Sequence, residues 1–281
     1  MFDLDAYLAR IDLPARPTRD AAGLSRLQRG HRLAIPFENL DVILGRGVAI
    51  ESAPVFAKLV GARRGGYCFE HNRLFGDALS AIGFVHRPLL ARVWLGVDLD
   101  QGALPPLTHT LSLVETGDEA WIADAGFGGT YAPVMPLRDG AEETAPDGAR
   151  FRLTQREGLG WLLERQGSPL GTDGRAQGTG WEPQYSFTTA PVAAADLAMG
   201  NWWTSTAPNT RFTTLRIASI VLPHGFAALT DTHYRRIAAA EATEGTITDP
   251  RVYRIRLGLM FGIQLTAADV EMLGLFPPRE A

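Results

Sequence analysis

The chain contains a single cysteine, Cys68, and the residues around it favour a nucleophile. Gly65, Gly66 and Tyr67 precede it and an apolar helical pattern follows, which predicts a tight turn that presents the thiol at the start of a helix. Free backbone N–H groups and the helix dipole stabilise a thiolate at such a position. A lone thiol makes neither an internal disulfide nor a cysteine-rich zinc site, so Cys68 is either inert core filling or a nucleophile.

Two further residues have the chemistry that a thiol nucleophile needs. His109 begins a predicted strand and shares a face with Leu111 and Leu113, because side chains alternate along a strand. Asp124 ends the next predicted strand, just before glycines. Taken singly, the histidine is typical of a core residue and the aspartate of a turn. Taken together with the thiol, the imidazole accepts its proton and the carboxylate orients the imidazole.

The order of cysteine, histidine and aspartate matches papain-like enzymes, so a cysteine hydrolase and an acyltransferase both fit these residues. His71 is a second candidate base, because it follows Cys68 by three positions in the predicted helix. We prefer His109, since a histidine placed so close in sequence has no obvious residue to orient it. The sequence has no cluster of His, Cys, Asp and Glu with metal-ligand spacing, so we expect no metal.

The elements that must position these residues change along the chain. Residues 1–83 have helical periodicity, and their last predicted helix runs from Cys68 to Ile82 and ends at Gly83. Residues 84–190 have alternating and β-branched residues separated by turns, and residues 191–281 mix both patterns. Pro36 predicts a loop over residues 35–40. We therefore expect an α+β protein with a helical, a β and a small α/β segment.

Composition and charge exclude several classes of function. A net charge of -4 without a basic stripe gives no reason to expect a nucleic-acid partner. Apolar runs such as residues 220–222 are far too short to span a membrane. Acidic residues near the N-terminus and the lone cysteine favour the reducing cytoplasm. No heptad or apolar patch indicates an oligomeric state.

Four blocks of sequence together resemble the arylamine N-acetyltransferase family. They are IPFENL at residues 35–40, RGGYCFEHN at residues 64–72, Thr108-His109, and DAGFG at residues 124–128. The resemblance is strong over the first half of the chain and only general over the last third. It implies an N-terminal helical bundle, a central β-barrel and a C-terminal α/β lid, with a catalytic core like that of cysteine proteases.

The resemblance also implies an activity. Cys68, His109 and Asp124 would form a catalytic triad that moves an acetyl group from acetyl-coenzyme A to the nitrogen of arylamines or arylhydrazines, or to the oxygen of N-hydroxyarylamines. The reaction would follow a ping-pong scheme through an acetyl-cysteine, with no bound cofactor and a role in xenobiotic metabolism. The alternatives are an amide synthase, or a cysteine hydrolase or transglutaminase-like enzyme, with the same triad. A third alternative is a binding protein without catalytic activity.

The resemblance assigns binding residues as well. The glycine-rich run after the aspartate is, by itself, a weak phosphate-loop pattern and reads as a turn. The family implies coenzyme A contacts there, at Gly126, Phe127, Gly128, Gly129 and Thr130. It also implies an aromatic acceptor pocket, for which we select Phe37, Tyr67 and Phe127. In the last third, the candidates for coenzyme A phosphates are Arg211, His233, Arg235 and Arg236, although for each residue alone ordinary surface charge is the better interpretation.

Overall fold

The structure, a computed structural model, describes residues 2–99, 103–176, 178–239 and 241–276. The helices are α1 (Leu4–Arg10), α2 (Ala21–Ala34), α3 (Leu40–Ile43), α4 (Ser52–Phe56), α5 (Cys68–Ile82), α6 (Ala194–Thr206), α7 (Arg211–Thr214), α8 (Pro250–Phe261) and α9 (Ala267–Met272), with a π-helix, η1 (Ala57–Gly61), and a 3₁₀ helix, η2 (Pro169–Gly171). The strands are β1 (Phe37–Glu38), β2 (Val85–Val93), β3 (Leu107–Thr116), β4 (Glu119–Ala123), β5 (Met135–Pro136), β6 (Ala141–Thr144), β7 (Arg150–Arg156), β8 (Gly160–Gln166), β9 (Glu182–Phe187), β10 (Ile217–Leu222), β11 (Gly225–Thr230), β12 (His233–Ala238) and β13 (Glu241–Thr246). This mixture of helices and antiparallel strands confirms the predicted α+β class.

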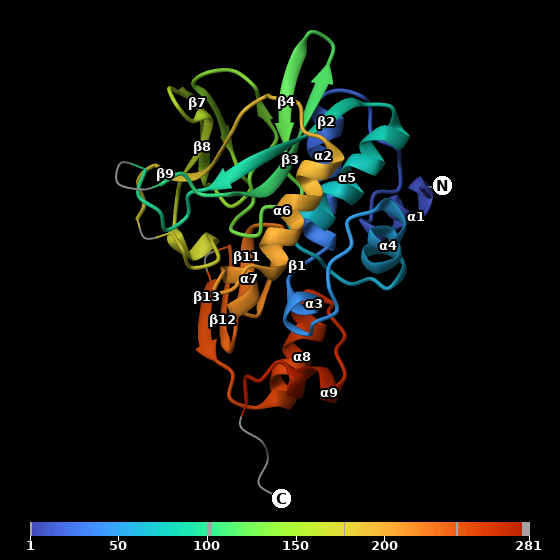
Figure 1. Ribbon diagram of the computed structural model, residues 1–281, viewed down its shortest axis with the longest axis vertical. Helices are drawn as coiled ribbons and strands as arrows, with labels where there is room; N and C mark the ends of the chain where they lie inside the picture. Colours follow the sequence, from blue (N-terminus) through green and yellow to red (C-terminus); the bar gives the residue numbers. More distant parts are fainter. Residues whose placement is uncertain (1, 100–102, 177, 240, 277–281) are drawn as a thin grey trace, which may run out of the picture.

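An eight-stranded antiparallel sheet forms the central part of the molecule. Its strand order is β5-β4-β3-β2-β9-β8-β7-β6, so the sheet curls until its edge strands, β5 and β6, approach each other. Apolar side chains such as Leu111, Phe151 and Tyr185 fill the interior. The helices near the N-terminus pack beside this sheet around a second apolar core, and Figure 1 shows them next to the green strands of the barrel.

A second, five-stranded sheet has the order β1-β10-β11-β12-β13. Its first strand corrects the loop predicted over residues 35–40, because Phe37 pairs with Ser219 and Glu38 with Ala218. Pro36 does mark a break, but the two residues after it complete a sheet whose other strands begin at residue 217, about 180 positions further along. No local pattern carries that information. Figure 1 shows this sheet below the barrel, with the C-terminal helices α8 and α9 under it.

Two elements connect the segments predicted from the sequence. Strand β1 comes from the helical segment and joins the C-terminal sheet. Helix α6 comes from the last segment but packs against β3 of the barrel. The divisions after residues 83 and 190 stay a prediction. Within the described part of the chain, no helix is both long and apolar enough to cross a membrane.

Helix α8 was not predicted, although its start signal is present in the sequence. Asp249 is the N-cap, its carboxylate accepts a hydrogen bond from Arg251 N at 2.7 Å, and Pro250 follows it as the first helical residue. Only Tyr253, Leu257 and Phe261 are buried, so the helix has a narrow apolar stripe that is easily overlooked.

Candidate active site

Helix α5 begins at Cys68 and its last residue is Ile82, as the sequence predicted. Glu70 closes the first turn, because its Oε2 accepts a hydrogen bond from Tyr67 N at 3.0 Å. A Cβ atom on Gly66 would lie 2.6 Å from this oxygen, so glycine is needed there. At the other end Gly83 adopts a φ of 97°, in the left-handed region that ends helices.

The Cys68 thiol is 3% exposed and lies 3.5 Å from Thr108 O, to which it donates. Burial, and after it the negative charge of Asp124, raise the pKa of this thiol. The N–H groups of Phe69 and Thr110 act in the opposite direction. The helix N-terminus thus favours the thiolate, but burial outweighs it. A thiolate at this site needs a nearby base that takes the proton and becomes positively charged.

His109 and Asp124 form a buried pair in which the imidazole Nε2 lies 2.7 Å from the carboxylate Oδ2. The two residues come together because β3 and β4 are antiparallel neighbours. The other carboxylate oxygen, Oδ1, accepts hydrogen bonds from Gly126 N at 2.9 Å and from Asn72 Nδ2 at 3.2 Å. Burial by itself raises the pKa of Asp124, but His109, the Gly126 N–H and Asn72 together hold this pKa below its ordinary value.

Asn72 fixes the nucleophile helix to the strands that carry the other two residues. It lies one turn after Cys68 on α5, and its Nδ2 also donates to Thr110 O at 2.6 Å. Its Oδ1 accepts from Ala125 N at 3.1 Å. One amide therefore binds both β3 and the segment after β4, which sets the position of α5 relative to His109.

His71, the second candidate base, takes part in a different buried chain of hydrogen bonds. Its Nδ1 lies 2.8 Å from His31 Nε2, and its Nε2 lies 3.1 Å from Pro36 O. His31 continues the chain to the Tyr7 hydroxyl at 2.9 Å. Burial lowers the pKa of His71 to about 3. Both ring nitrogens of His71 are engaged away from the thiol, so the geometry favours His109 as the base.

Cys68 and His109 line one pocket with a volume of about 360 Å³. Phe37 and Phe127, both selected for the acceptor pocket, line it too, and the Phe127 ring meets the His109 ring edge-on at 5.2 Å between centroids. Tyr67 lies elsewhere, fully buried, with its hydroxyl donating to the backbone of Asn201 on α6. A larger cavity of about 650 Å³ lies between α5, β2, β3 and α6 and contains neither Cys68 nor His109, so we assign the chemistry to the smaller one.

The glycine-rich run after Asp124 divides between the pocket and the interior. Gly126, Phe127 and Gly128 line the pocket. Gly129 stands beside Leu95 and Arg175, and Thr130 is fully buried with its hydroxyl donating to Gly171 O at 3.3 Å.

Arg32 of α2 binds backbone carbonyls of the glycine-rich run that follows Asp124. Its guanidinium donates to Ala125 O at 3.3 Å, to Phe127 O at 2.6 Å and to Thr130 O at 3.1 Å, and its side chain is buried. Gln28, one turn earlier, accepts from Asp124 N at 2.7 Å. The sequence analysis missed both residues. Their only signal was a polar face on a helix otherwise expected to be packed, and nothing local indicated what they bind.

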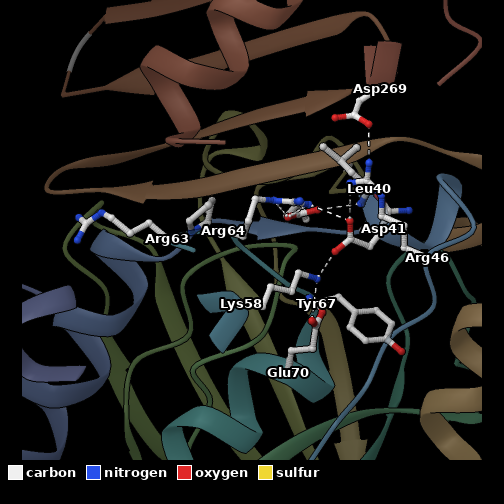
Figure 2. A network of polar contacts seen from close by, with 12 residues as sticks. Leu40, Asp41, Arg46, Lys58, Arg63, Arg64, Tyr67, Glu70 and Asp269 are labelled. Carbon is white, nitrogen blue, oxygen red and sulfur yellow. Dashed lines mark hydrogen bonds and ion pairs between the residues drawn. The ribbon is translucent and has the colours of Figure 1, made fainter. Parts of the chain in front are cut away.

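A network of ion pairs surrounds the start of α5, and Figure 2 shows it. Lys58 of η1 binds Glu70 and Asp41, each at 2.8 Å, and Arg64 binds Glu38 at 2.6 Å and Asp41 at 3.2 Å. Three carboxylates thus face two cations in a buried space. Burial raises the pKa of Glu70 to about 7, although Lys58 acts to lower it.

The same network reaches the C-terminal part of the chain. Arg46, which binds Asp41 at 3.4 Å, also binds Asp269 of α9 at 2.5 Å. Asn39 adds a second connection, because its Nδ2 donates to Phe212 O and Leu215 O and its Oδ1 accepts from Ile217 N. The wall of the pocket that β10 and α7 supply is therefore fixed to residues adjacent to the nucleophile helix.

Comparisons with known proteins agree with this fold. The family model described as N-acetyltransferase matches residues 20–270. The arylamine N-acetyltransferase / N-hydroxyarylamine O-acetyltransferase of Salmonella typhimurium is 38% identical over 265 residues, which are 92% of this chain and 88% of that protein. The arylamine N-acetyltransferase of Mycolicibacterium smegmatis is 40% identical over 223 residues, 78% of this chain and 76% of that protein.

Solved structures give the same result. The Salmonella typhimurium arylamine N-acetyltransferase superposes with a TM-score of 0.87 at 33% identity and covers 97% of this chain and 98% of its own. A Mycobacterium marinum arylamine N-acetyltransferase in complex with CoA superposes with a TM-score of 0.84 at 30% identity, over 96% and 98% of the two chains. The fold and the sequence define an N-acetyltransferase. This chain belongs to the arylamine N-acetyltransferase family.

Proposed function

We propose that this protein transfers acetyl groups from acetyl-coenzyme A to the nitrogen of arylamines or arylhydrazines through an acetyl-Cys68 intermediate. The observation that carries the proposal is one pocket lined by both the Cys68 thiol and His109, whose imidazole is hydrogen-bonded to Asp124. Family membership supports the choice of reaction, and the Mycobacterium marinum relative was solved with CoA. Transfer to the oxygen of N-hydroxyarylamines belongs to the same proposal, because the name of the Salmonella relative includes it.

The first half-reaction acetylates Cys68. The Nε2–H of His109 donates a hydrogen bond to the Asp124 carboxylate. The unprotonated Nδ1 then accepts the proton of the Cys68 thiol. The thiolate attacks the carbonyl carbon of the thioester, the bond between that carbon and the coenzyme A sulfur breaks, and the imidazolium returns the proton to the departing sulfur. Asp124, held ionised by its hydrogen bonds, stabilises the imidazolium in between.

The second half-reaction transfers the acetyl group from Cys68 to the amine. The amine nitrogen attacks the acetyl carbon, passes a proton to His109, and the bond from that carbon to Sγ breaks as Cys68 takes the proton back. Phe37 and Phe127 give the pocket aromatic walls against which a flat ring packs. A pocket lined mainly by apolar side chains also limits the access of water to the thioester. We retain Gly126, Phe127 and Gly128, which line the pocket, as proposed coenzyme A contacts. Gly129 and Thr130, predicted for the same role, are buried outside the pocket lining and are not kept.

Intact-protein mass spectrometry tests the proposal directly. Mixed with acetyl-coenzyme A, the protein should gain the mass of one acetyl group, at Cys68, and lose it again when an arylamine is added. The C68S variant should gain nothing under the same conditions. An acetyl adduct that water removes as fast as the amine does would favour a hydrolase. The absence of any adduct on the folded protein would favour a binding protein and contradict the proposal.

A further inference from the structure

Three fully buried polar side chains have no role in the mechanism above and form one continuous chain of hydrogen bonds. Tyr7 of α1, His31 of α2 and His71 of α5 are all 0% exposed. The Tyr7 hydroxyl lies 2.9 Å from His31 Nδ1, and His31 Nε2 lies 2.8 Å from His71 Nδ1. The chain ends where His71 Nε2 lies 3.1 Å from Pro36 O. In the apolar core around them, these side chains depend on one another for their hydrogen bonds.

The carbonyl at the end of the chain fixes the direction of every bond in it. A carbonyl oxygen only accepts, so His71 must carry its proton on Nε2 to bind Pro36 O. The bare Nδ1 of a neutral His71 then accepts from His31 Nε2–H, and the bare Nδ1 of His31 accepts from the Tyr7 hydroxyl. The opposite direction, with the bond to Pro36 kept, would need a charged His71. Burial, and after it the positive charge of Arg32, lower the pKa of His71 to about 3, so the ring is neutral at physiological pH.

Pro36 O contacts the turn that leads into the nucleophile. It also accepts from Gly66 N at 3.4 Å, and a Cβ atom on Gly65 would lie 2.3 Å from it. The two glycines therefore pack directly against this carbonyl. Because Cys68 follows them at the start of α5, a shift of Pro36 would move the first turn of that helix.

The residue after Pro36 is Phe37, which lines the pocket together with Cys68. The Phe37 ring lies nearly parallel to the His71 ring, at an angle of 12° and 6.2 Å between centroids. A Cβ atom on Gly128 would lie 2.6 Å from the Phe37 ring, so this ring has little space in which to move. His71 thus acts on the pocket wall through its ring and on the nucleophile turn through its Nε2.

We propose that His71 is a positioning residue for the acetylation of Cys68. Tyr7 and His31 hold it in the tautomer that binds Pro36 O. The inference rests on the proposed function and adds to it a role for three side chains that do not line the pocket. The Nε2–H of His71 fixes the nucleophile turn and the pocket wall relative to each other, so that the thioester carbonyl meets the thiol in a reactive geometry. A displacement of about 1 Å costs about 10² in the rate of such a reaction.

Two amide substitutions separate the two ends of the His71 ring. The amide in His71→Gln reaches the place of Nε2 and still donates to Pro36 O, whereas the shorter amide in His71→Asn reaches the place of Nδ1 and binds only His31. Both remove the ring, so both should lower the melting temperature. The burst of 4-nitrophenol from saturating 4-nitrophenyl acetate gives the rate constant for acetylation of Cys68. It should stay within about threefold of wild type in His71→Gln and fall about 10²-fold in His71→Asn.

A core variant separates positioning from a general loss of stability. Leu24→Ala removes a fully buried side chain of α2 and no hydrogen bond, so it should lower the melting temperature and keep the acetylation rate. Equal rates in His71→Gln and His71→Asn would overturn the proposal, and so would a Leu24→Ala variant as slow as His71→Asn. A wild-type protein that gives no burst would instead refute the proposed function.

A measurement on the unmodified protein covers the case in which the His71 variants fail to fold, and it does not depend on turnover. In protein labelled with ¹⁵N-histidine, NMR should show both His31 and His71 protonated at Nε2 and unprotonated at Nδ1. Contacts with the Tyr7 and Phe37 rings identify the two histidines. Tyr7→Phe should move the His31 Nδ1 signal toward that of a nitrogen without a hydrogen bond. A neutral His71 with its proton on Nδ1 would contradict the proposal, because Nε2 would have nothing to donate to Pro36 O.

Discussion

His109 Nε2 lies 2.7 Å from Asp124 Oδ2, and the two side chains are 3% and 2% exposed. At this depth a single hydrogen bond decides which imidazole nitrogen carries the proton and which is left for the thiol. Asn72 and the Gly126 N–H occupy the second carboxylate oxygen, so the aspartate cannot rotate without losing two further bonds.

Asp124→Asn should abolish this control while it preserves the shape of the site. An amide NH₂ donates to Nε2 and leaves Nδ1 protonated, so the thiol loses its base. We expect kcat to fall by about 10³ to 10⁴. Stopped-flow acetylation by 4-nitrophenyl acetate measures the effect, and the rate of Cys68 alkylation against pH should move to higher pH. The control is Asp77→Asn, which should react like wild type. It removes a partly exposed ion pair with Arg73 on the same helix, α5.

Gly126→Ala should inactivate the protein through close contact with the nucleophile helix. The new Cβ would lie 2.6 Å from Asn72 Nδ2 and 2.8 Å from Cys68 O, and a helix displaced by about 1 Å is expected to lose about 10² in rate. Gly61→Ala is the matched change, because a Cβ there has no neighbour within 4 Å. Steady-state rates of the two variants check the prediction. Equal activity would mean that the helix tolerates the displacement.

Glu70 should make stability fall as the pH rises. Its pKa in the folded protein is about 7, raised by burial, whereas the ordinary value is 4.5. Between these two values the folded state retains a proton that the unfolded state releases, so the free energy of unfolding decreases with pH. Relative to Glu70→Gln, wild type should lose about 2 kcal/mol between pH 5 and 7.5.

Denaturant unfolding of both proteins at the two pH values gives this difference, and the comparison cancels the groups that they share. A difference between wild type and Glu70→Gln that stays constant with pH would show that Lys58 keeps Glu70 ionised throughout.

Arg32→Met should destabilise the protein far more than Arg29→Met. Arg32 is buried and satisfies the carbonyls of Ala125, Phe127 and Thr130, so its removal leaves these acceptors without a donor. We expect a loss of about 3 kcal/mol or more. Arg29, one turn earlier on α2, makes an exposed hydrogen bond to Pro223 O and should cost below about 1 kcal/mol. Thermal and denaturant unfolding measure both values.

The sequence predicted correctly those features that depend on residues close together in the chain. The helix from Cys68 to Ile82 was predicted with its ends, because Gly66 and Gly83 act on their immediate neighbours. Residue type and order singled out Cys68, His109 and Asp124, and their catalytic roles stay a prediction. Tyr67 was placed in the pocket wall because it adjoins the thiol, yet an N-cap side chain leaves in a different direction and reaches α6.

The remaining features depend on partners that are distant in sequence. Strand β1 needs β10, and Arg32 needs carbonyls about a hundred residues further on. A side chain's type shows that it seeks a partner, and only the tertiary fold shows which one.

The pairing of β1 with β10 also determines the order of events during synthesis. When residue 124 has left the ribosome, Cys68, His109 and Asp124 all exist, but Phe37 has no strand to pair with until residues 217–222 emerge. The nascent chain therefore carries its reactive thiol for many translation steps before the last wall closes around it. A thiol that is 3% exposed in the finished protein is open to oxidants and alkylating agents in that interval.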